Sequence, residues 1–306
     1  MKILITGVAG FIGRNLAPLL KKNGHYVIGL DIYTEIKSEL YEVLDDYRQY
    51  DLLIRGDISD VVNNLDYVVH LAGEASVNAN KNQLKTKNEL ATAYLVEALA
   101  KNKNQKIIFL SSAKVSSQNK YYAKSKKRSE NKIIFSSINS DLKYTILRCA
   151  VIYGKGMKSN LMRWLKKVQI GSIRKIPPNN SEISMIGISD LCKIITGCIG
   201  NIATDNKTYL VTDGHSYRIN EIETVVRNIN PDNINKIYPK LVIYIAAKIG
   251  DMLQIIGIKF PLNSGAYYMF FKNKVKHDSR IYNDLGIQPT QNFLEEIPAL
   301  LAEKIT

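Results

Sequence analysis

Short runs of apolar and β-branched residues alternate along the first half of the chain with longer segments whose apolar positions recur at helical spacing. The strand-like runs lie at residues 2–6, 25–31, 66–73, 106–112 and 144–154. Helical patterns end near Leu20, extend from Asn88 to Lys101, and follow Tyr121. Strict alternation of strands and helices indicates βαβ units, which form a parallel sheet with right-handed crossovers. The pattern therefore predicts an α/β fold with a doubly wound parallel sheet.

The pattern loosens after Lys155. Gly171, Pro177 and Pro178 mark irregular structure. A strand and helix over residues 185–199 and a strand over 208–214 come next, and we expect both pieces to return to the sheet. The predicted domains are a sheet domain, residues 1–155 joined by 184–212, and a smaller C-terminal lobe formed by 156–183 and 213–306.

Composition narrows the class of protein. The chain has 306 residues, of which 45% are hydrophobic and 23% charged, which is typical of globular proteins and excludes disordered and collagen-like chains. The formal net charge of +14 favours an anionic partner such as a nucleotide, a nucleic acid or an acidic lipid. The lysines between Lys101 and Lys132 have few aromatic residues among them, so we expect a solvated charged face there and no nucleic-acid site.

The cysteines and the first apolar run bear on the compartment. Cys149, Cys192 and Cys198 form no C-x-x-C pair, so we expect no disulfide framework and no metal site, which fits a reducing cytoplasm. Gly7 and Gly10 interrupt the run that begins at Lys2, so it is interpreted as a strand and turn and not as a secretion signal.

A later apolar segment, residues 241–258, contains Lys248, Asp251 and Gln254 and is too polar for a membrane span. Its apolar residues recur at helical spacing: Leu241, Ile245, Ile249, Met252 and Ile256. We expect this stripe to pack in the core or the lobe, with contact to a membrane surface as the alternative.

Three glycines follow the first strand and open the first helix: Gly7, Gly10 and Gly13. Glycines there permit a tight turn and close approach of a pyrophosphate to the backbone, and the helix N-terminus attracts the anion. Asp31 ends the second strand, where a carboxylate accepts hydrogen bonds from an adenosine ribose and repels a 2′-phosphate. The sequence therefore predicts NAD in preference to NADP, unless Lys37 or Arg48 folds nearby and offsets Asp31.

Tyr122 and Lys126 are four residues apart, so on a helix they share one face. A neighbouring ammonium favours the phenolate and brings the phenol towards the range of a general base. Ser112 ends a predicted strand at the edge where open α/β sheets bind ligands. Tyr121 has Ser125 at the corresponding position and lacks such a partner.

Taken together, these motifs resemble the extended short-chain dehydrogenase/reductase family, and within it the nucleotide-sugar epimerase/dehydratase branch. The matching segments are TGVAGFIG (6–13), Gly56 with Asp57, HLAG (70–73), Asn88 with Thr92, SSAKV (111–115), Tyr122 with Lys126, and LRCAVIYGKG (147–156). The resemblance covers roughly the first two thirds of the chain. It implies a Rossmann fold, a substrate-binding C-terminal lobe, and NAD held by Gly7, Gly10, Phe11, Ile12, Gly13, Asp31, Asp57, Ile58, Leu71, Ala72, Gly73, Asn88, Tyr122 and Lys126.

The resemblance also implies roles for the catalytic residues. Tyr122 takes the proton of a sugar hydroxyl, Ser112 hydrogen-bonds that oxygen, and Lys126 holds the nicotinamide ribose and lowers the pKa of the phenol. Dehydratases of this branch usually carry an Asp-Glu pair after the catalytic Ser or Thr. Ala113 and Lys114 stand there instead, which leaves redox chemistry at C4 of the sugar.

The function implied is an NAD-dependent 4-epimerase of a UDP-hexose or UDP-N-acetylhexosamine in surface polysaccharide synthesis. The alternatives are an NAD(P)H-dependent 4-keto reductase and a non-catalytic NAD(P)-binding protein. Asn160 and Arg163 are the implied substrate-binding residues of the lobe. Ile183 and Gly187 replace an Arg and a His usual in the family, so part of the pocket lining differs. We expect a cytoplasmic homodimer that does not bind nucleic acid.

Overall fold

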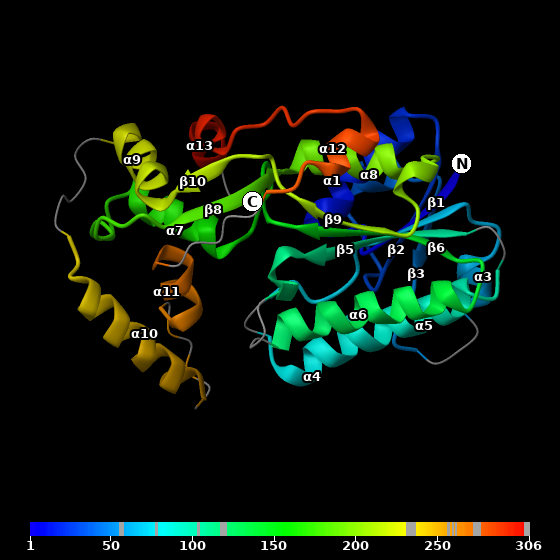
Figure 1. Cartoon of the computed structure of the whole chain (residues 1–306), viewed down its shortest axis with the longest axis horizontal. Coiled ribbons are helices and arrows are strands. Elements are labelled where there is room, and N and C mark those ends of the chain that lie inside the picture. The colour runs from blue at the N-terminus through cyan, green and yellow to red at the C-terminus, as the bar shows by residue number, and fades with distance from the viewer. Residues whose placement is uncertain are drawn as a thin grey trace. The chain divides into compact units, whose positions relative to one another are not determined.

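The chain divides into two compact units, each assembled from several segments. Unit 1 comprises residues 1–152, 188–212 and 278–290, and unit 2 comprises 153–187, 213–277 and 291–306. The computed structural model (Figure 1) describes residues 1–54, 58–76, 79–102, 105–116, 121–230, 237–255, 258, 260, 262–271 and 277–302. Compared with the predicted domains, residues 278–290 belong to the sheet unit and the strand over 182–187 belongs to the other unit.

A seven-stranded parallel sheet forms the centre of unit 1. In spatial order its strands are β3 (Asp46–Gln49), β2 (Tyr26–Asp31), β1 (Lys2–Thr6), β4 (Tyr67–His70), β5 (Lys106–Ser112), β6 (Lys143–Cys149) and β9 (Lys207–Val211). This order confirms the predicted doubly wound fold. Strand β3 was not expected, because its sequence DYRQ lacks the apolar run that marks a buried strand.

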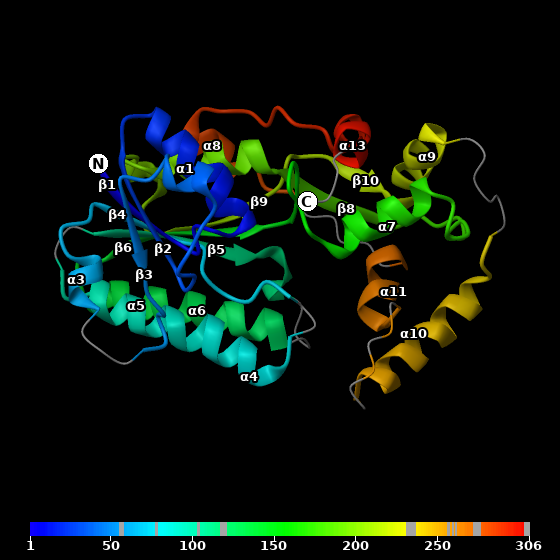
Figure 2. The same ribbon diagram turned by 180° about the vertical axis from the view of Figure 1, so that it is seen from behind.

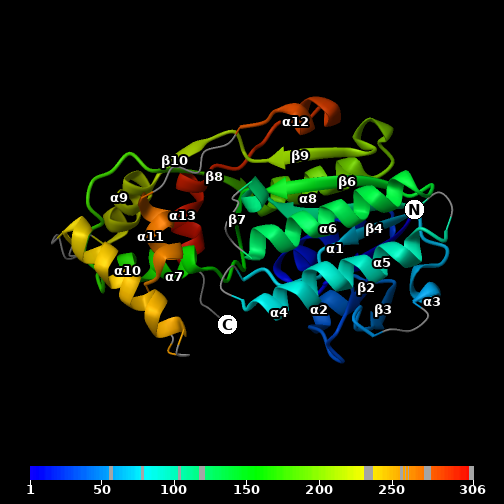
Figure 3. The same ribbon diagram turned by 60° about the horizontal axis from the view of Figure 1, so that its bottom comes forward.

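Helices cover both faces of this sheet. Its helices are α1 (Phe11–Lys22), α2 (Ser38–Tyr41), α3 (Ser59–Val62), α4 (Lys81–Leu84), the π-helical turn η1 (Lys85–Leu90), α5 (Ala91–Leu99), the short 3₁₀ turn η2 (Ala113–Ser116), α6 (Tyr121–Ile138), α8 (Ile188–Cys198), the 3₁₀ turn η3 (Ile202–Thr204) and α12 (Arg280–Leu285). Figures 1 and 2 show α1 and α8 on one face and α5 and α6 on the other, and Figure 3 shows α5 and α6 side by side.

One hydrophobic cluster of unit 1 lies between the sheet and the layer of α5 and α6. Strand residues such as Leu4, Val68 and Phe109 meet Leu95 and Ile133 of the two helices there. All seven residues of β5 are buried, as expected for a central parallel strand covered on both faces. This packing fixes the carboxyl ends of β1, β4 and β5 relative to one another.

Among the described residues, unit 2 contains five helices and most of a three-stranded sheet, whose strand β7 (Val151–Tyr153) begins in unit 1. Its other elements are α7 (Asn160–Gln169), β8 (Glu182–Gly187), β10 (Ser216–Arg218), α9 (Ile219–Ile229), α10 (Lys240–Ile255), α11 (Ser264–Phe271) and α13 (Phe293–Ala302). Strand β8 pairs antiparallel with β10. The expectation that the strand near residue 185 returns to the main sheet is therefore wrong, whereas β9 does return to it.

The apolar stripe of α10 lies on the protein surface. Leu241, Ile245, Ile249 and Met252 are 67%, 49%, 48% and 69% exposed. The expectation that this stripe packs in the core or lobe is therefore wrong for these four residues. Ile256, the fifth member, lies outside the described residues.

Candidate active site

The turn between β1 and α1 contains two close approaches that only glycine permits. Gly7 has a φ of +72°, and a Cβ atom there would lie 2.8 Å from the backbone nitrogen of Ala72. A Cβ atom at Gly13 would lie 2.4 Å from the carbonyl oxygen of Val8. Gly10 precedes α1 as its N-cap with an extended backbone. The backbone of the turn at Gly7 therefore packs against the residues that follow β4, and the start of α1 at Gly13 packs against the backbone of Val8.

The N-terminus of α1 suits an anion. Phe11, Ile12 and Gly13 form the start of the helix, where N–H groups have no partner within the helix. The first turn of α1, all of it described, holds no acidic residue, while Lys21 and Lys22 stand at the other end. The positive end of the helix dipole is thus not neutralised by a carboxylate of its own turn.

Asp31 is held beside this turn. Its carboxylate accepts hydrogen bonds from the backbone nitrogens of Ala9, at 3.0 Å, and Ile32, at 2.8 Å. Each carboxylate oxygen has a further lone pair, so the group can still accept hydrogen bonds from a ribose. Arg48, considered as an offsetting cation, donates instead to Asp46 at 2.9 Å and to the carbonyl oxygen of Val61 at 2.8 Å.

Two other predicted cofactor positions follow β3. Gly56 and Asp57 lie outside the described residues. Ile58 is buried and belongs to the hydrophobic core together with Leu4 and Ile28. Its side chain therefore contributes to packing, which leaves its backbone for contact with a cofactor.

The segment after β4 is tied to both the glycine turn and α6. Leu71 and Ala72 donate backbone hydrogen bonds to the carbonyl and hydroxyl oxygens of Thr6, at 3.1 and 3.2 Å. A Cβ atom at Gly73 would lie 2.7 Å from the side-chain oxygen of Asn88. That oxygen accepts from the Glu74 nitrogen at 2.7 Å, and the Asn88 amide donates to Ser125 Oγ at 3.0 Å. Asn88 thus links the β4 end to α6, which places it as a positioning residue.

A buried histidine completes this link, and sequence reasoning missed its role. His70 pairs through its two ring nitrogens with Thr6 Oγ1, at 2.7 Å, and Thr92 Oγ1, at 3.0 Å. Burial, aided by the charge of Lys126, lowers the pKa of His70 to about 3, so the ring is neutral at physiological pH. In the sequence, the only signal for this role was the presence of threonines at the end of β1 and in α5 that could hydrogen-bond to the histidine ring.

The structure brings Ser112, Tyr122 and Lys126 together at the carboxyl end of β5. Ser112 lies beside Tyr122, and its hydroxyl acts to lower the pKa of the phenol. Lys126 Nζ donates to the carbonyl oxygen of Leu110 at 2.9 Å, which places the ammonium beside the same strand. Tyr121 is 59% exposed, so it does not share this site.

Burial controls the ionisation of the pair on α6. It raises the pKa of Tyr122 to about 12 and outweighs the opposing hydrogen bond from Ser112. The expectation that Lys126 brings the phenol towards general-base range is therefore wrong for the polypeptide alone, because the cost of desolvating the phenolate is larger. Burial also lowers the pKa of Lys126 to about 8, so most of it remains protonated at neutral pH.

A buried carboxylate anchors α6 one turn beyond Lys126. Glu130 is fully buried, and its carboxylate accepts three hydrogen bonds. Ser111 Oγ donates one at 2.6 Å, and Arg148 Nε and Nη2 donate the others at 2.8 and 2.7 Å. These bonds join α6 to β5 and β6, and the Arg148 guanidinium helps to hold the pKa of Glu130 below its usual value although burial acts in the opposite direction. Sequence reasoning missed Glu130, although its spacing of four from Lys126 put it on the same helix face.

Asn160 and Arg163 lie in unit 2, in the first turn of α7. Both are exposed, and the Arg163 guanidinium donates to the Asn160 side-chain oxygen. Ser159 caps the helix through a bond from the Met162 nitrogen at 3.1 Å. Their role in binding substrate stays a prediction.

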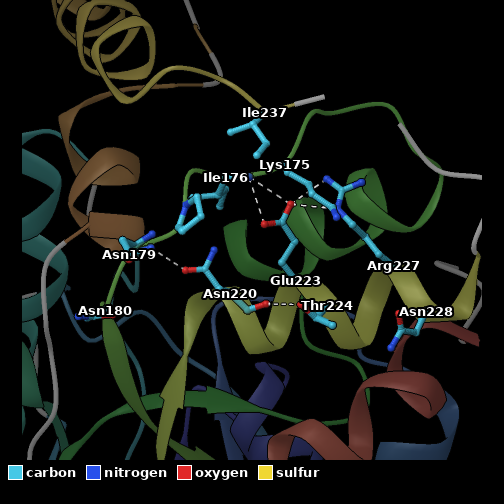
Figure 4. Close-up of a pocket in the computed structure, with 11 residues that line it drawn as sticks. Lys175, Ile176, Asn179, Asn180, Asn220, Glu223, Thr224, Arg227, Asn228 and Ile237 are labelled. Carbon is cyan, nitrogen blue, oxygen red and sulfur yellow. Dashed lines mark hydrogen bonds and ion pairs between the residues drawn. The ribbon is translucent and has the colours of Figure 1, made fainter. Parts of the chain in front are cut away.

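Unit 2 also contains a polar pocket of about 600 Å³ between the 175–180 segment and α9 (Figure 4). Glu223 and Arg227 form an ion pair at 2.7 Å in its wall, and the Ile176 nitrogen donates to Glu223. The Asn220 side chain accepts from the Asn179 nitrogen at 3.0 Å. Because these groups bind one another, we attribute the pocket to the packing of the 175–180 segment on α9.

Fold and site together define a nucleotide-dependent enzyme of the doubly wound class, with a Ser, Tyr and Lys centre at the carboxyl edge of its sheet. The chain belongs to the NAD dependent epimerase/dehydratase family, whose model matches residues 3–211. The predicted family, enzyme class and NAD cofactor are confirmed at this level.

Relatives support the same placement. The chain is 26% identical over 243 residues to UDP-glucose 4-epimerase of Vibrio cholerae, covering 70% of this chain and 71% of that protein. It is 24% identical over 294 residues to an N-acetyl-α-D-glucosaminyl-diphospho-ditrans,octacis-undecaprenol 4-epimerase of Escherichia coli O157:H7, covering 86% and 83%. Among solved structures, UDP-glucose 4-epimerase of Thermotoga maritima with UDP-glucose has a TM-score of 0.77 at 19% identity, covering 98% and 97%.

The residues present fit NAD. The tight turn that Gly7 and Gly13 permit places the free N–H groups at the start of α1 directly after β1, which suits a pyrophosphate, and Asp31 suits a ribose that carries free hydroxyls. Within the described residues, no helix combines the length and apolar character that crossing a membrane requires.

Proposed function

We propose that this protein is an NAD-dependent 4-epimerase of a UDP-linked hexose or N-acetylhexosamine. The observation that carries the proposal is the placement of Ser112 beside Tyr122, with Lys126 beside the same strand end and no carboxylate directly after Ser112. That set of groups can exchange a proton with a sugar hydroxyl. It holds no acid-base pair for eliminating water.

Two relatives support this substrate class. UDP-glucose 4-epimerase of Vibrio cholerae and UDP-glucuronate 4-epimerase 6 of Arabidopsis thaliana, 23% identical over 95% of this chain, both act at C4 by their names. Asn160 and Arg163 at the N-terminus of α7 supply an amide, a guanidinium and a helix end, a combination that suits the diphosphate of a nucleotide sugar.

The chain's own groups handle the proton of the 4-hydroxyl. Tyr122 Oη accepts that proton, while the Ser112 hydroxyl donates a hydrogen bond to the reacting oxygen. The chemistry that bound NAD would supply is reversible uptake of the hydride from C4, and its positive ring would favour the phenolate that burial disfavours. Lys126 would hold the ribose next to that ring, and its ammonium adds to the positive potential at Tyr122. Tyr122 would return the proton to the 4-oxygen once C4 is reduced again, which restores the hydroxyl of the 4-epimer.

Two features of the site position these groups. Glu130 fixes the turn of α6 after Lys126 to β5 and β6, and Asn88 fixes the turn that contains Ser125 to the end of β4. The acid-base groups and the glycine turn thus belong to one bonded network in unit 1. A shift of α6 would misplace the phenol relative to the cofactor cradle.

The experiment is an epimerisation assay with a label. Purified protein is incubated with UDP-glucose or UDP-N-acetylglucosamine deuterated at C4, without added nicotinamide nucleotide. We expect the 4-epimer to form with its deuterium still at C4, because the hydride returns to the carbon it left. Turnover that requires a 4-keto sugar nucleotide and NADH or NADPH would replace the proposal with a 4-keto reductase. Absence of both activities would favour a non-catalytic NAD-binding protein.

The predicted homodimer and cytoplasmic location stay predictions. The three cysteines are free and buried, and burial raises the pKa of the Cys149 thiol to about 12. Such thiols suit a reducing compartment.

A further inference from the structure

The exposed face of α10 is apolar over the described length of the helix. Besides the four residues of its stripe, Val242 and Tyr244 are 50% and 41% exposed. On a helical projection, Leu241, Val242, Ile245, Ile249 and Met252 fall within about one third of the circumference. A continuous apolar face of this kind on a protein surface marks a contact with another apolar phase or molecule.

The opposite side of α10 is anchored within unit 2. Ala247 is 1% exposed, and a Cβ atom at Gly250 would overlap the carbonyl oxygen of Leu262. Tyr244 packs edge-on against Tyr267 of α11, and α11 in turn places Phe270 against Trp164 of α7, with ring centroids 5.1 Å apart. Figures 1 and 3 show α10 alongside α11. The exposed stripe is therefore held facing outward by packing on the other side of the helix.

Positive charge borders this face. Lys248 is exposed, and its Nζ lies 5.6 Å from the centre of the Tyr244 ring. Lys240 is also exposed but directs its Nζ to within 5.4 Å of the centre of the Phe271 ring of α11. The surrounding sequence, residues 236–276, contains seven lysines and a single acidic residue, Asp251. The Asp251 carboxylate accepts hydrogen bonds from the nitrogen and hydroxyl of Ser264, so it is directed towards the α11 side.

We propose that α10 is a membrane-surface helix whose apolar stripe inserts into the interface of an anionic lipid bilayer. Lys248 contacts the lipid phosphates at the border of the stripe, and the lysine excess of the segment adds long-range attraction. A second copy of the chain fits this surface less well, because two such basic faces repel each other. With 16 residues, α10 is about 24 Å long, too short to cross the hydrocarbon core, so it lies in the plane of the interface.

This proposal stands independently of the proposed reaction. An enzyme that modifies soluble nucleotide sugars and one that modifies lipid-linked sugars both gain from a bilayer location if their products are used there. The binding test below needs no substrate, so its result and that of the epimerisation assay are separate.

The test is flotation of the full-length protein with vesicles. We expect binding to vesicles of phosphatidylcholine mixed with phosphatidylglycerol, weaker binding to phosphatidylcholine alone, and release as salt is raised. The double variant Ile245→Ser/Ile249→Ser should lower the partition coefficient at least about tenfold for the anionic vesicles. Lys248→Gln should lower it about fivefold, and only where anionic lipid is present.

The matched control is Ile138→Ser/Ile202→Ser, which changes two residues of unit 1 that are 75% and 85% exposed. It should bind vesicles like the wild type. Circular dichroism and thermal melting verify that every variant is folded. The proposal is overturned if the wild type floats with neither vesicle, or if the α10 double variant binds as well as the wild type. It is equally overturned if the double variant's only effect is to dissolve a vesicle-independent dimer.

Discussion

Two lysine-bearing helices of this protein use their surfaces in opposite ways. Helix α6, Tyr121–Ile138, buries polar and charged residues, among them Ser125, Lys126 and Glu130. Helix α10, Lys240–Ile255, exposes apolar ones, among them Leu241 and Met252. These residues reverse the ordinary distribution, in which charge lies outside and apolar surface inside, although Lys124, Lys127 and Lys132 of α6 are exposed in the usual way.

The reversal has a different physical basis in each helix. Buried charge is tolerated on α6 because partners within unit 1 bind it, as Arg148 and Ser111 bind Glu130. On α10 the exposed stripe has its explanation outside the chain's own packing. A buried charge thus indicates groups held for chemistry or position, and an exposed apolar stripe indicates a partner. Four predictions separate the two helices, from the largest expected effect to the smallest.

The largest effect is expected at Tyr122. Tyr122→Phe keeps the ring and deletes the acid-base hydroxyl, so turnover should fall by about 10²–10⁴-fold while NAD affinity changes little. Steady-state rates and calorimetric titration with NAD measure the two quantities. Tyr121→Phe, at the exposed neighbouring position, is the control and should leave the rate unchanged. Near wild-type turnover of Tyr122→Phe would contradict the assigned acid-base role.

The next effect is structural and concerns Glu130. Glu130→Gln keeps the shape but leaves Arg148 without its buried carboxylate partner, so the free energy of unfolding should fall by about 3 kcal/mol. Urea denaturation gives the value. The control is Glu89→Gln, whose partner Arg128 is 61% exposed at the side chain, so the loss there should stay below about 1 kcal/mol. Equal losses in the two variants would remove Glu130 from its anchoring role.

The two helices also differ in how far the sequence predicts them. The spacing of Tyr122 and Lys126 predicted α6 and the face on which both residues lie, because the preceding strand and the glycine turn restrict where that helix can pack. The π-helical turn that contains Asn88 depends on tertiary contacts, and so do the hydrogen bonds between Glu130 and its partners. Tertiary contacts leave no periodic pattern in the sequence. For α10 the helix itself was predicted, but helical spacing alone gives no information about which phase the apolar face meets.

The same limits apply to the sheet. Strands β1, β2 and β5 were predicted within one residue, because apolar runs bounded by turns mark buried parallel strands. Polar β3 was missed at the sheet edge. Strand β8 was assigned to the wrong sheet, since EISMIG is as apolar as a central strand and its antiparallel pairing with β10 is set by chain connections in unit 2.

A smaller effect is expected from Lys126→Met. Burial lowers the pKa of Lys126 from 10.5 to about 8. Between these two pH values the unfolded chain therefore keeps the proton on Lys126, whereas the folded chain has released it. Wild-type stability should therefore rise as pH increases from 8 to 10.5, and the cost of the buried ammonium is fully present below pH 8. The Met variant lacks both the cost and the rise.

After allowing about 1 kcal/mol for the lost bond to Leu110, Lys126→Met should be about 2 kcal/mol more stable at neutral pH, yet inactive. Urea denaturation at neutral and alkaline pH measures the difference between the variant and the wild type. A variant less stable than the wild type at both pH values would show that Lys126 is held by favourable contacts and carries no desolvation cost.

The smallest effect on stability is expected on α10. Ile245 is 49% exposed, so Ile245→Ser removes little buried area and should change the free energy of unfolding by no more than about 0.5 kcal/mol. The matched control is Ile222→Ser on α9 of the same unit, where the side chain is fully buried and the substitution should cost about 3 kcal/mol. Urea denaturation in the absence of lipid measures both. A large loss at Ile245 would mean that the stripe is covered by the chain itself or by a second copy in solution, and the contrast between α6 and α10 would then disappear. A negligible loss leaves the stripe free for a partner, because its apolar side chains are then uncovered in solution and together form a continuous apolar face.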